Sequence, residues 1–136
     1  MAKNGMDSRN ALNNNAIVAN LHYQQFNLLL TGDIEEIAEK EMIRFYQKDR
    51  ACRAIVLKVA HHGSKSSSTQ PFLEIVKPKI ALIGVGENNT FGHPNEGVLE
   101  RLEKIGAKIY RTDEKGEISL KVNNKGQIKI NTKIGK

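Results

Sequence analysis

The chain has one cysteine, Cys52, and no tryptophan among its 136 residues. A single cysteine excludes an internal disulfide and any cysteine-rich zinc site. No strand end, helix start or basic cluster adjoins Cys52 to activate its thiol, so we do not expect a nucleophile there. Aromatic residues make up only 5% of the chain, which argues against a platform for stacking nucleic-acid bases.

Long apolar runs are also missing. No segment approaches the ~20 apolar residues that span a bilayer, and Met1–Met6 carries no apolar leader. We therefore expect a chain that is soluble as written. Residues 1–12 predict either a disordered tail or a cut inside a longer protein, whereas residues 13–136 fit one domain.

The charge balance is basic. The chain has 21 Lys and Arg against 15 Asp and Glu, a formal net charge of +6. This excess favours an anionic partner such as DNA. Because the basic residues are spread along the chain, we expect them to contact backbone phosphates.

Strands alternate with helices along the chain. Apolar patterning predicts strands at residues 16–23, 26–30, 54–60, 80–85, 108–111, 117–122 and 127–131. Helical spacing predicts helices from Ile34 to near Asp49, over 71–76, and around 98–105 with Gly106 as its cap. The sequence therefore predicts an α/β fold with a mixed β-sheet and flanking helices.

His61 and His62 follow a buried strand and precede Gly63. Imidazole is the commonest metal ligand, and sheet proteins usually place their chemistry where a strand ends in a loop. Because neighbouring strand residues point to opposite faces, we expect at most one of the pair to bind a metal directly. The alternative is that both make only local hydrogen bonds.

A carboxylate stands at the end of an earlier strand. Asp33 directly precedes a predicted helix, with Glu36 three residues later, which is the pattern of a helix cap. It also stands at the carboxyl end of a strand, where it would face the same crevice as the histidines. On the helix itself, Glu35 and Glu39 fall away from the apolar stripe.

Two further groups are candidates for contact with substrate. Ser64, Lys65 and Ser66 offer hydroxyls and a cation to a phosphate oxygen, or form a solvated loop. His93 stands between Gly92 and Pro94 in a stiff loop after another strand, where a histidine is either structural or catalytic.

Three ordered motifs carry a resemblance to a known family. Leu28–Asp33, Leu57–Ser64 and Phe91–Pro94 resemble the metallo-β-lactamase-like domain at the C-terminus of the ComEC/Rec2 competence proteins. The resemblance covers residues 13–120 and implies an αββα sandwich that binds one or two ions, often zinc. It implies Asp33 and His62 as metal ligands and catalytic residues, His61 beside the metal or in the place of His62, and His93 as a catalytic residue at the rim.

The family's first metal motif, His-x-His-x-Asp-His, does not occur in this sequence. The chain therefore resembles the second half of such a domain, and half a ligand set predicts weak zinc binding or none by the chain alone. An uncovered sheet face predicts association with the missing half or with a second copy. The resemblance also implies that the parent protein is embedded in a membrane. It does not imply on which side of the membrane this chain lies.

Two classes of function follow. The first is a fragment of a metal-dependent phosphodiesterase or nuclease domain linked to DNA uptake, inactive by itself. The second is a non-catalytic module that binds nucleic acid or protein. A lactam or thioester hydrolase is a third alternative, because fold alone does not set the substrate.

Overall fold

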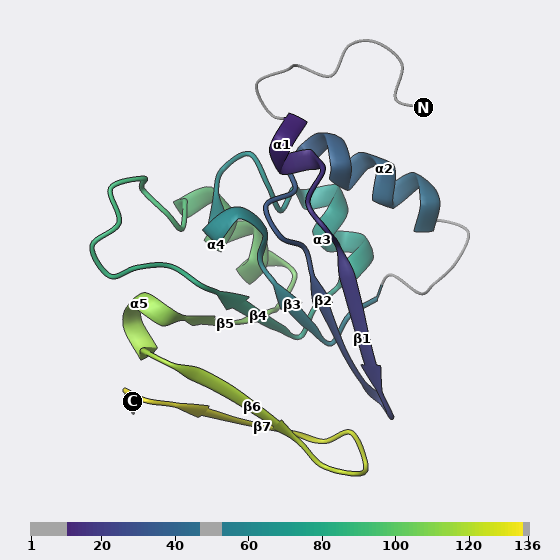
Figure 1. Ribbon diagram of the computed structural model, residues 1–136, viewed down its shortest axis with the longest axis vertical. Coiled ribbons are helices and arrows are strands. Elements are labelled where there is room, and N and C mark those ends of the chain that lie inside the picture. Colours follow the sequence, from purple (N-terminus) through teal and green to yellow (C-terminus); the bar gives the residue numbers. More distant parts are fainter. Residues whose placement is uncertain (1–10, 47–52, 135–136) are drawn as a thin grey trace.

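A computed structural model describes residues 11–46 and 53–134 of the chain. In chain order the elements are α1 (Ala11–Asn14), β1 (Ala19–Tyr23), β2 (Phe26–Leu30), α2 (Glu36–Tyr46), β3 (Val56–Lys58), a 3₁₀ turn (Ala60–Gly63), α3 (Gln70–Val76), β4 (Ile80–Ile83), α4 (Glu96–Lys104), β5 (Lys108–Arg111), α5 (Thr112–Lys115), β6 (Ile118–Val122) and β7 (Ile128–Thr132). Figure 1 shows the helices α2, α3 and α4 on one side of the sheet and the β6–β7 hairpin on the other.

The main sheet has five strands in the order β1-β2-β3-β4-β5. β1 pairs antiparallel with β2, whereas β2, β3, β4 and β5 are parallel neighbours. The predicted α/β class with a mixed sheet and flanking helices is therefore confirmed. Because the four parallel strands run the same way, the loops that follow them emerge at one edge of the sheet.

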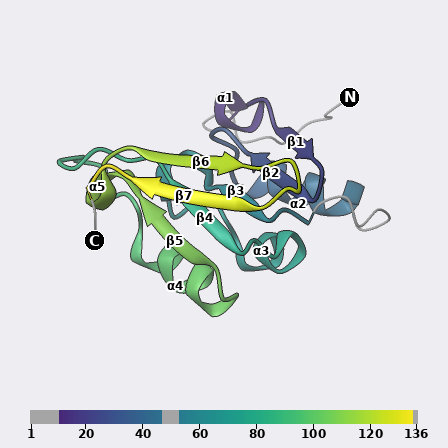
Figure 2. The ribbon, with the colours of Figure 1, turned by 90° about the horizontal axis from the view of Figure 1, so that it is seen from below.

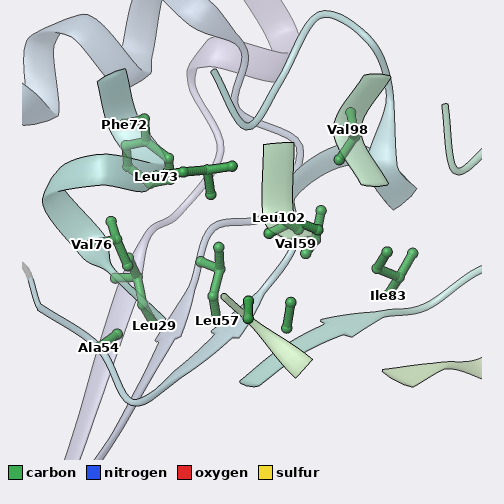
Figure 3. Packing of buried hydrophobic residues seen from close by; sticks show 12 residues of the cluster. Leu29, Ala54, Leu57, Val59, Phe72, Leu73, Val76, Ile83, Val98 and Leu102 are labelled. Carbon is green, nitrogen blue, oxygen red and sulfur yellow. The ribbon is translucent and has the colours of Figure 1, made fainter. Parts of the chain in front are cut away.

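The core lies between this sheet and the helices (Figure 3). Leu29, Leu57 and Ala81 are register partners on the face toward the helices, and all three are buried. Phe72 of α3 and Leu102 of α4 pack against them from the helical side. Each fully buried Leu or Phe side chain contributes ~1.5–3 kcal/mol relative to exposure, so this layer fixes the strand ends in place.

The β6–β7 hairpin crosses the opposite face of the sheet (Figure 2). Its turn packs closely on the β1–β2 turn, since a Cβ on Gly126 would stand 2.8 Å from the backbone nitrogen of Gln25. Phe26 and Val56 are buried on this face, but Leu21 and Tyr23 of β1 remain 54% and 47% exposed. The hairpin therefore covers only part of the face that the sequence predicted to be open.

Several predicted boundaries change in the structure. The strand predicted over residues 54–60 covers only Val56–Lys58, and the strand predicted over 80–85 ends at Ile83. The predicted extension of α2 toward Asp49, residues 1–10 of the predicted tail over 1–12, and Cys52 lie outside the described residues, whereas residues 11 and 12 of that tail belong to α1. Across residues 11–46 and 53–134, no helix is long and apolar enough to cross a membrane.

Candidate functional site at the carboxyl edge of the sheet

The candidate residues gather where β2, β3 and β4 end. Asp33 follows β2, His61 and His62 follow β3, and His93 lies in the loop after β4. A backbone hydrogen bond of 3.0 Å from the N–H of His61 to the carbonyl of Gly32 ties the first two loops together. The rings of His61 and His93 lie 5.7 Å apart between centroids. The tertiary fold thus brings the three sequence motifs to one edge.

A tight turn sets the directions of the paired imidazoles. His61 (φ 49°, ψ 42°), His62 (φ 55°, ψ 23°) and Gly63 (φ 81°) all have left-handed backbone conformations. Left-handed backbone costs a non-glycine residue ~1–2 kcal/mol, so surrounding contacts hold this turn in place. The two histidines lie in this turn and not on a strand, which ends at Lys58, so the turn and not strand alternation sets the directions of the two rings.

His62 has one ring nitrogen engaged by the protein. Its Nδ1 lies 2.6 Å from the carbonyl oxygen of Gly84, at the end of β4. A carbonyl only accepts, so Nδ1 donates and the neutral ring keeps its lone pair on Nε2. The side chain is exposed, which leaves Nε2 able to bind a metal or accept a proton.

His61 faces a buried carboxylate instead. Its Nδ1 lies 3.4 Å from Oε1 of Glu35, whose side chain is only 7% exposed. The same oxygen accepts a hydrogen bond of 2.8 Å from the hydroxyl of Ser66. Among residues 11–46 and 53–134, neither Nδ1 of His61 nor Oε2 of Glu35 finds a hydrogen-bond partner, although both atoms are buried. A carboxylate in this position favours the proton on Nδ1 and so again leaves Nε2 free.

Sequence reasoning missed Glu35. The apolar stripe of the helix predicts Glu35 and Glu39 on the solvent side, but both are buried, at 6% and 0% exposure. The available signal was its position two residues after Asp33, at the same strand end. Glu39 has a structural role: it accepts hydrogen bonds from the backbone N–H groups of Ser68 and Thr69, and burial raises its pKa.

Asp33 does not cap the helix. The amide oxygen of Asn14 accepts from the N–H groups of Glu35 and Ala38, and the N–H of Glu36 donates to the carbonyl of Ser66. The capping interpretation of Asp33 is therefore wrong, and its carboxylate is exposed at the site edge.

Lys58 is a second group that sequence reasoning missed. It ends β3, and its Nζ donates to the carbonyl of Val59 at 3.1 Å. Burial lowers the pKa of this ammonium, and the negative charge of Asp33 partly offsets the effect. A Cβ on Gly84 would lie 3.4 Å from Cε of Lys58, so this glycine makes room for the lysine. The edge therefore combines a carboxylate, a cation and imidazoles.

The serine-rich tract after the histidines turns inward. Ser64 is 6% exposed, and its hydroxyl lies 2.9 Å from that of Ser66. Lys65, between them, is exposed. The two serines thus support Glu35, and Lys65 is the exposed cation of the tract. Their substrate-binding role stays a prediction.

His93 lies at the rim, beside His61. The side chain of Asn89 fixes its backbone, accepting from the N–H of His93 at 3.0 Å and donating to its carbonyl at 2.7 Å. Burial lowers the pKa of His93, and the charges of His61 and His62 lower it further. A neutral ring near pH 7 is suited to proton transfer. Whether it acts in catalysis stays a prediction.

The residues present do not by themselves fit a metal ion. Within the part of the chain that the structure describes, no group of three or more His, Cys, Asp or Glu side chains is placed to hold one. Zinc normally takes four ligands, or three and a water. Asp33 and His62 are available donors at neighbouring strand ends, but the carboxylate of Glu35 faces His61.

Comparison with known proteins identifies the family. No protein-family model matches the chain. It is 35% identical over 113 residues to ComE operon protein 3 of Bacillus subtilis (strain 168), which covers 83% of this chain. It is 34% identical over 99 residues to competence protein ComA of Neisseria gonorrhoeae, which covers 73% of it. Recombination protein 2 of Haemophilus influenzae is 35% identical over 91 residues, or 67% of this chain.

This chain carries a ComEC/Rec2-like domain. The predicted resemblance is confirmed at this level. The matches span 14% of the Bacillus and Neisseria proteins and 11% of the Haemophilus protein. The ComEC/Rec2-like domain therefore corresponds to a small part of each relative.

Proposed function

We propose that this ComEC/Rec2-like domain is half of a metal-dependent hydrolase domain that acts on the phosphodiester backbone during DNA uptake. The observation that carries the proposal is the hydrogen bond from Nδ1 of His62 to the carbonyl of Gly84. Protein metal sites typically hold a ligating imidazole through its other nitrogen in this way. Asp33 at the neighbouring strand end supplies a second donor.

The remaining donors come from outside the described residues, in another segment or another chain. Asp33 and His62 make only two of the four ligands that zinc normally takes. Metal bound in the completed site would supply an activated water at neutral pH. The ComEC/Rec2-like domain alone is therefore inactive in this proposal.

The other residues of the edge have supporting roles. Glu35 orients His61, and Ser66 holds Glu35 in turn. Lys65 contacts a phosphate oxygen as an exposed cation. His93 transfers a proton or contacts substrate from the rim, where burial lowers its pKa.

The uncovered sheet face supports the proposal of half a sandwich. Leu21, Tyr23 and Leu30 are 54%, 47% and 40% exposed on the face away from the helices. Leu21 and Tyr23 lie two residues apart on one face of β1, and Leu30 lies on the same face of β2, two residues from Leu28, the register partner of Leu21. Exposed apolar residues grouped in this way mark a surface that another layer covers.

Zinc titration of the whole chain, followed by the imidazole resonances, tests the proposal. We expect weak binding that shifts the ring signals of His62. His62→Ala removes this binding, whereas the matched variant His61→Ala retains it. One equivalent of tightly held zinc in a monomer would contradict the half-site. Loss of binding in His61→Ala alone would reverse the roles of the two histidines.

In a completed domain, substitutions of His62 and His93 distinguish a metal ligand from a residue that contacts only the substrate or transfers a proton. His62→Ala is expected to lose both metal and phosphodiester cleavage. His93→Ala is expected to keep its metal and to lose about 10²–10⁴-fold in rate if the ring works as an acid or base. Metal content and cleavage rate, measured on both variants, distinguish the two roles.

A second candidate is a non-catalytic module that binds DNA. The net charge of +6 and the lack of a three-donor metal group among the described residues favour it. DNA binding that persists in a chelator, in a completed domain that never cleaves, would select this function over the hydrolase.

A further inference from the structure

A pocket of about 480 Å³, lined in part by His22, lies at the opposite edge of the sheet from His61, His62 and His93. The β1–β2 turn, the residues before β3 and the connection from α3 to β4 form its walls. In Figure 1 these segments meet at the end of the sheet where β1 turns into β2. Its volume falls within the range of ~300–1,000 Å³ that is typical of ligand sites.

The walls of this pocket carry positive charge. Arg53, Lys77 and Lys79 line it, and all three side chains are exposed. Among the described residues that line it, none is an aspartate or a glutamate. Gln24 and Gln25 add amide groups that donate hydrogen bonds. Cations that converge on a concave surface without a carboxylate attract anions.

The backbone that carries two of these cations is fixed. The side chain of Asn27 bridges the segment before β3, accepting from the N–H of Ile55 at 2.7 Å and donating to the carbonyl of Arg53. The N–H of Lys79 donates to the carbonyl of Ile55 at 3.0 Å. Arg53 and Lys79 therefore project from a single hydrogen-bonded framework, which lowers the cost of ordering them around a ligand.

We propose that this pocket binds the phosphate groups of a nucleic-acid strand, at a site separate from the histidine edge. Arginine and lysine contact phosphate oxygens, and the glutamine amides donate to phosphate or sugar oxygens. Five-residue strands such as β2 separate the two edges, which corresponds to ~16 Å. The site needs no metal, so it does not depend on the hydrolase proposal.

Binding of a labelled single-stranded oligonucleotide at a series of salt concentrations tests the site. Arg53→Gln and Lys79→Gln are each expected to reduce the slope of log affinity against log salt by about 1. The double variant is expected to bind about tenfold more weakly at low salt. Lys104→Gln, which removes the same charge from the exposed end of α4, is the matched control. Thermal unfolding of each variant checks that the fold is retained.

The location is tested separately with inorganic pyrophosphate. We expect its amide chemical-shift changes to centre on Gln25, Asn27 and Lys79, with or without a chelator. Changes confined to His61 and His62, or Lys79→Gln binding like Lys104→Gln, would overturn the proposal. Pocket-dependent binding to anionic lipid vesicles without oligonucleotide binding would overturn the nucleic-acid assignment. If the parent chain binds no zinc at His62, that result would count against the hydrolase proposal and not against the phosphate pocket.

Discussion

Gly63 joins the histidine turn to the loop that carries His93, so Gly63→Ala should destabilise the protein strongly. A Cβ at this position would stand 2.6 Å from Cβ and 3.0 Å from Cα of Pro94. The N–H of Asn95 donates to the carbonyl of Gly63 at 2.8 Å, so the two segments cannot separate without losing a hydrogen bond.

Two costs add at this residue. The backbone has φ +81°, which costs an alanine ~1–2 kcal/mol. The contact with Pro94 adds the ~1–3 kcal/mol typical of overpacking. We therefore expect a loss of about 2–5 kcal/mol in the free energy of unfolding. At roughly 3–5 °C per kcal/mol for a chain of this size, Tm should fall by about 6–25 °C.

Two other glycines separate these costs. Gly92 has φ +71° but no atom within 4 Å of an added Cβ, so Gly92→Ala should show the backbone cost alone. Gly86 has neither a positive φ nor an atom close to an added Cβ. The free energy of unfolding of Gly86→Ala should therefore lie within about 0.5 kcal/mol of that of the parent. Urea unfolding of the three variants provides the comparison. Equal losses in Gly63→Ala and Gly92→Ala would refute the packing of Pro94 on Gly63.

Two further predictions concern a buried acid and the open sheet face. Burial raises the pKa of Glu39 above its ordinary 4.5, so its stabilising contribution is full below that value and is lost as pH rises through the folded-state pKa. The difference in unfolding free energy between parent and Glu39→Gln should therefore be largest in acid, with exposed Glu36→Gln as control. Light scattering should show self-association that Leu21→Lys weakens and Ile37→Lys, on α2, does not.

Each of these has a clear opposing result. A Glu39→Gln difference that grows from acid to neutral pH would mean that the hydrogen bonds from Ser68 and Thr69 outweigh burial. A monomer at all concentrations, unaffected by Leu21→Lys, would mean that the β6–β7 hairpin covers the open face sufficiently.

The elements of the fold followed from local patterns. Apolar alternation located the β1–β2 hairpin and the terminal β6–β7 hairpin, and helical spacing located α3 and α4. Burial of a strand on both faces leaves a continuous apolar run, which is visible in β3 and β4 without any tertiary information. The ends of the elements were less visible, because the turn at His61 and His62 uses backbone conformations that these residues rarely adopt.

The sequence by itself determined which strands end in reactive side chains, and hence that Asp33, His61, His62 and His93 are candidates. Only the tertiary structure decided their partners, because these come from segments far apart in the chain: Gly84 for His62, Glu35 for His61, and Asn14 in place of Asp33 at the helix start. Helical periodicity placed Glu35 toward solvent, since periodicity describes one helix and not the loop that folds over it. The basic pocket was likewise invisible, because Arg53 and Lys79 become neighbours only when β3 and β4 pair.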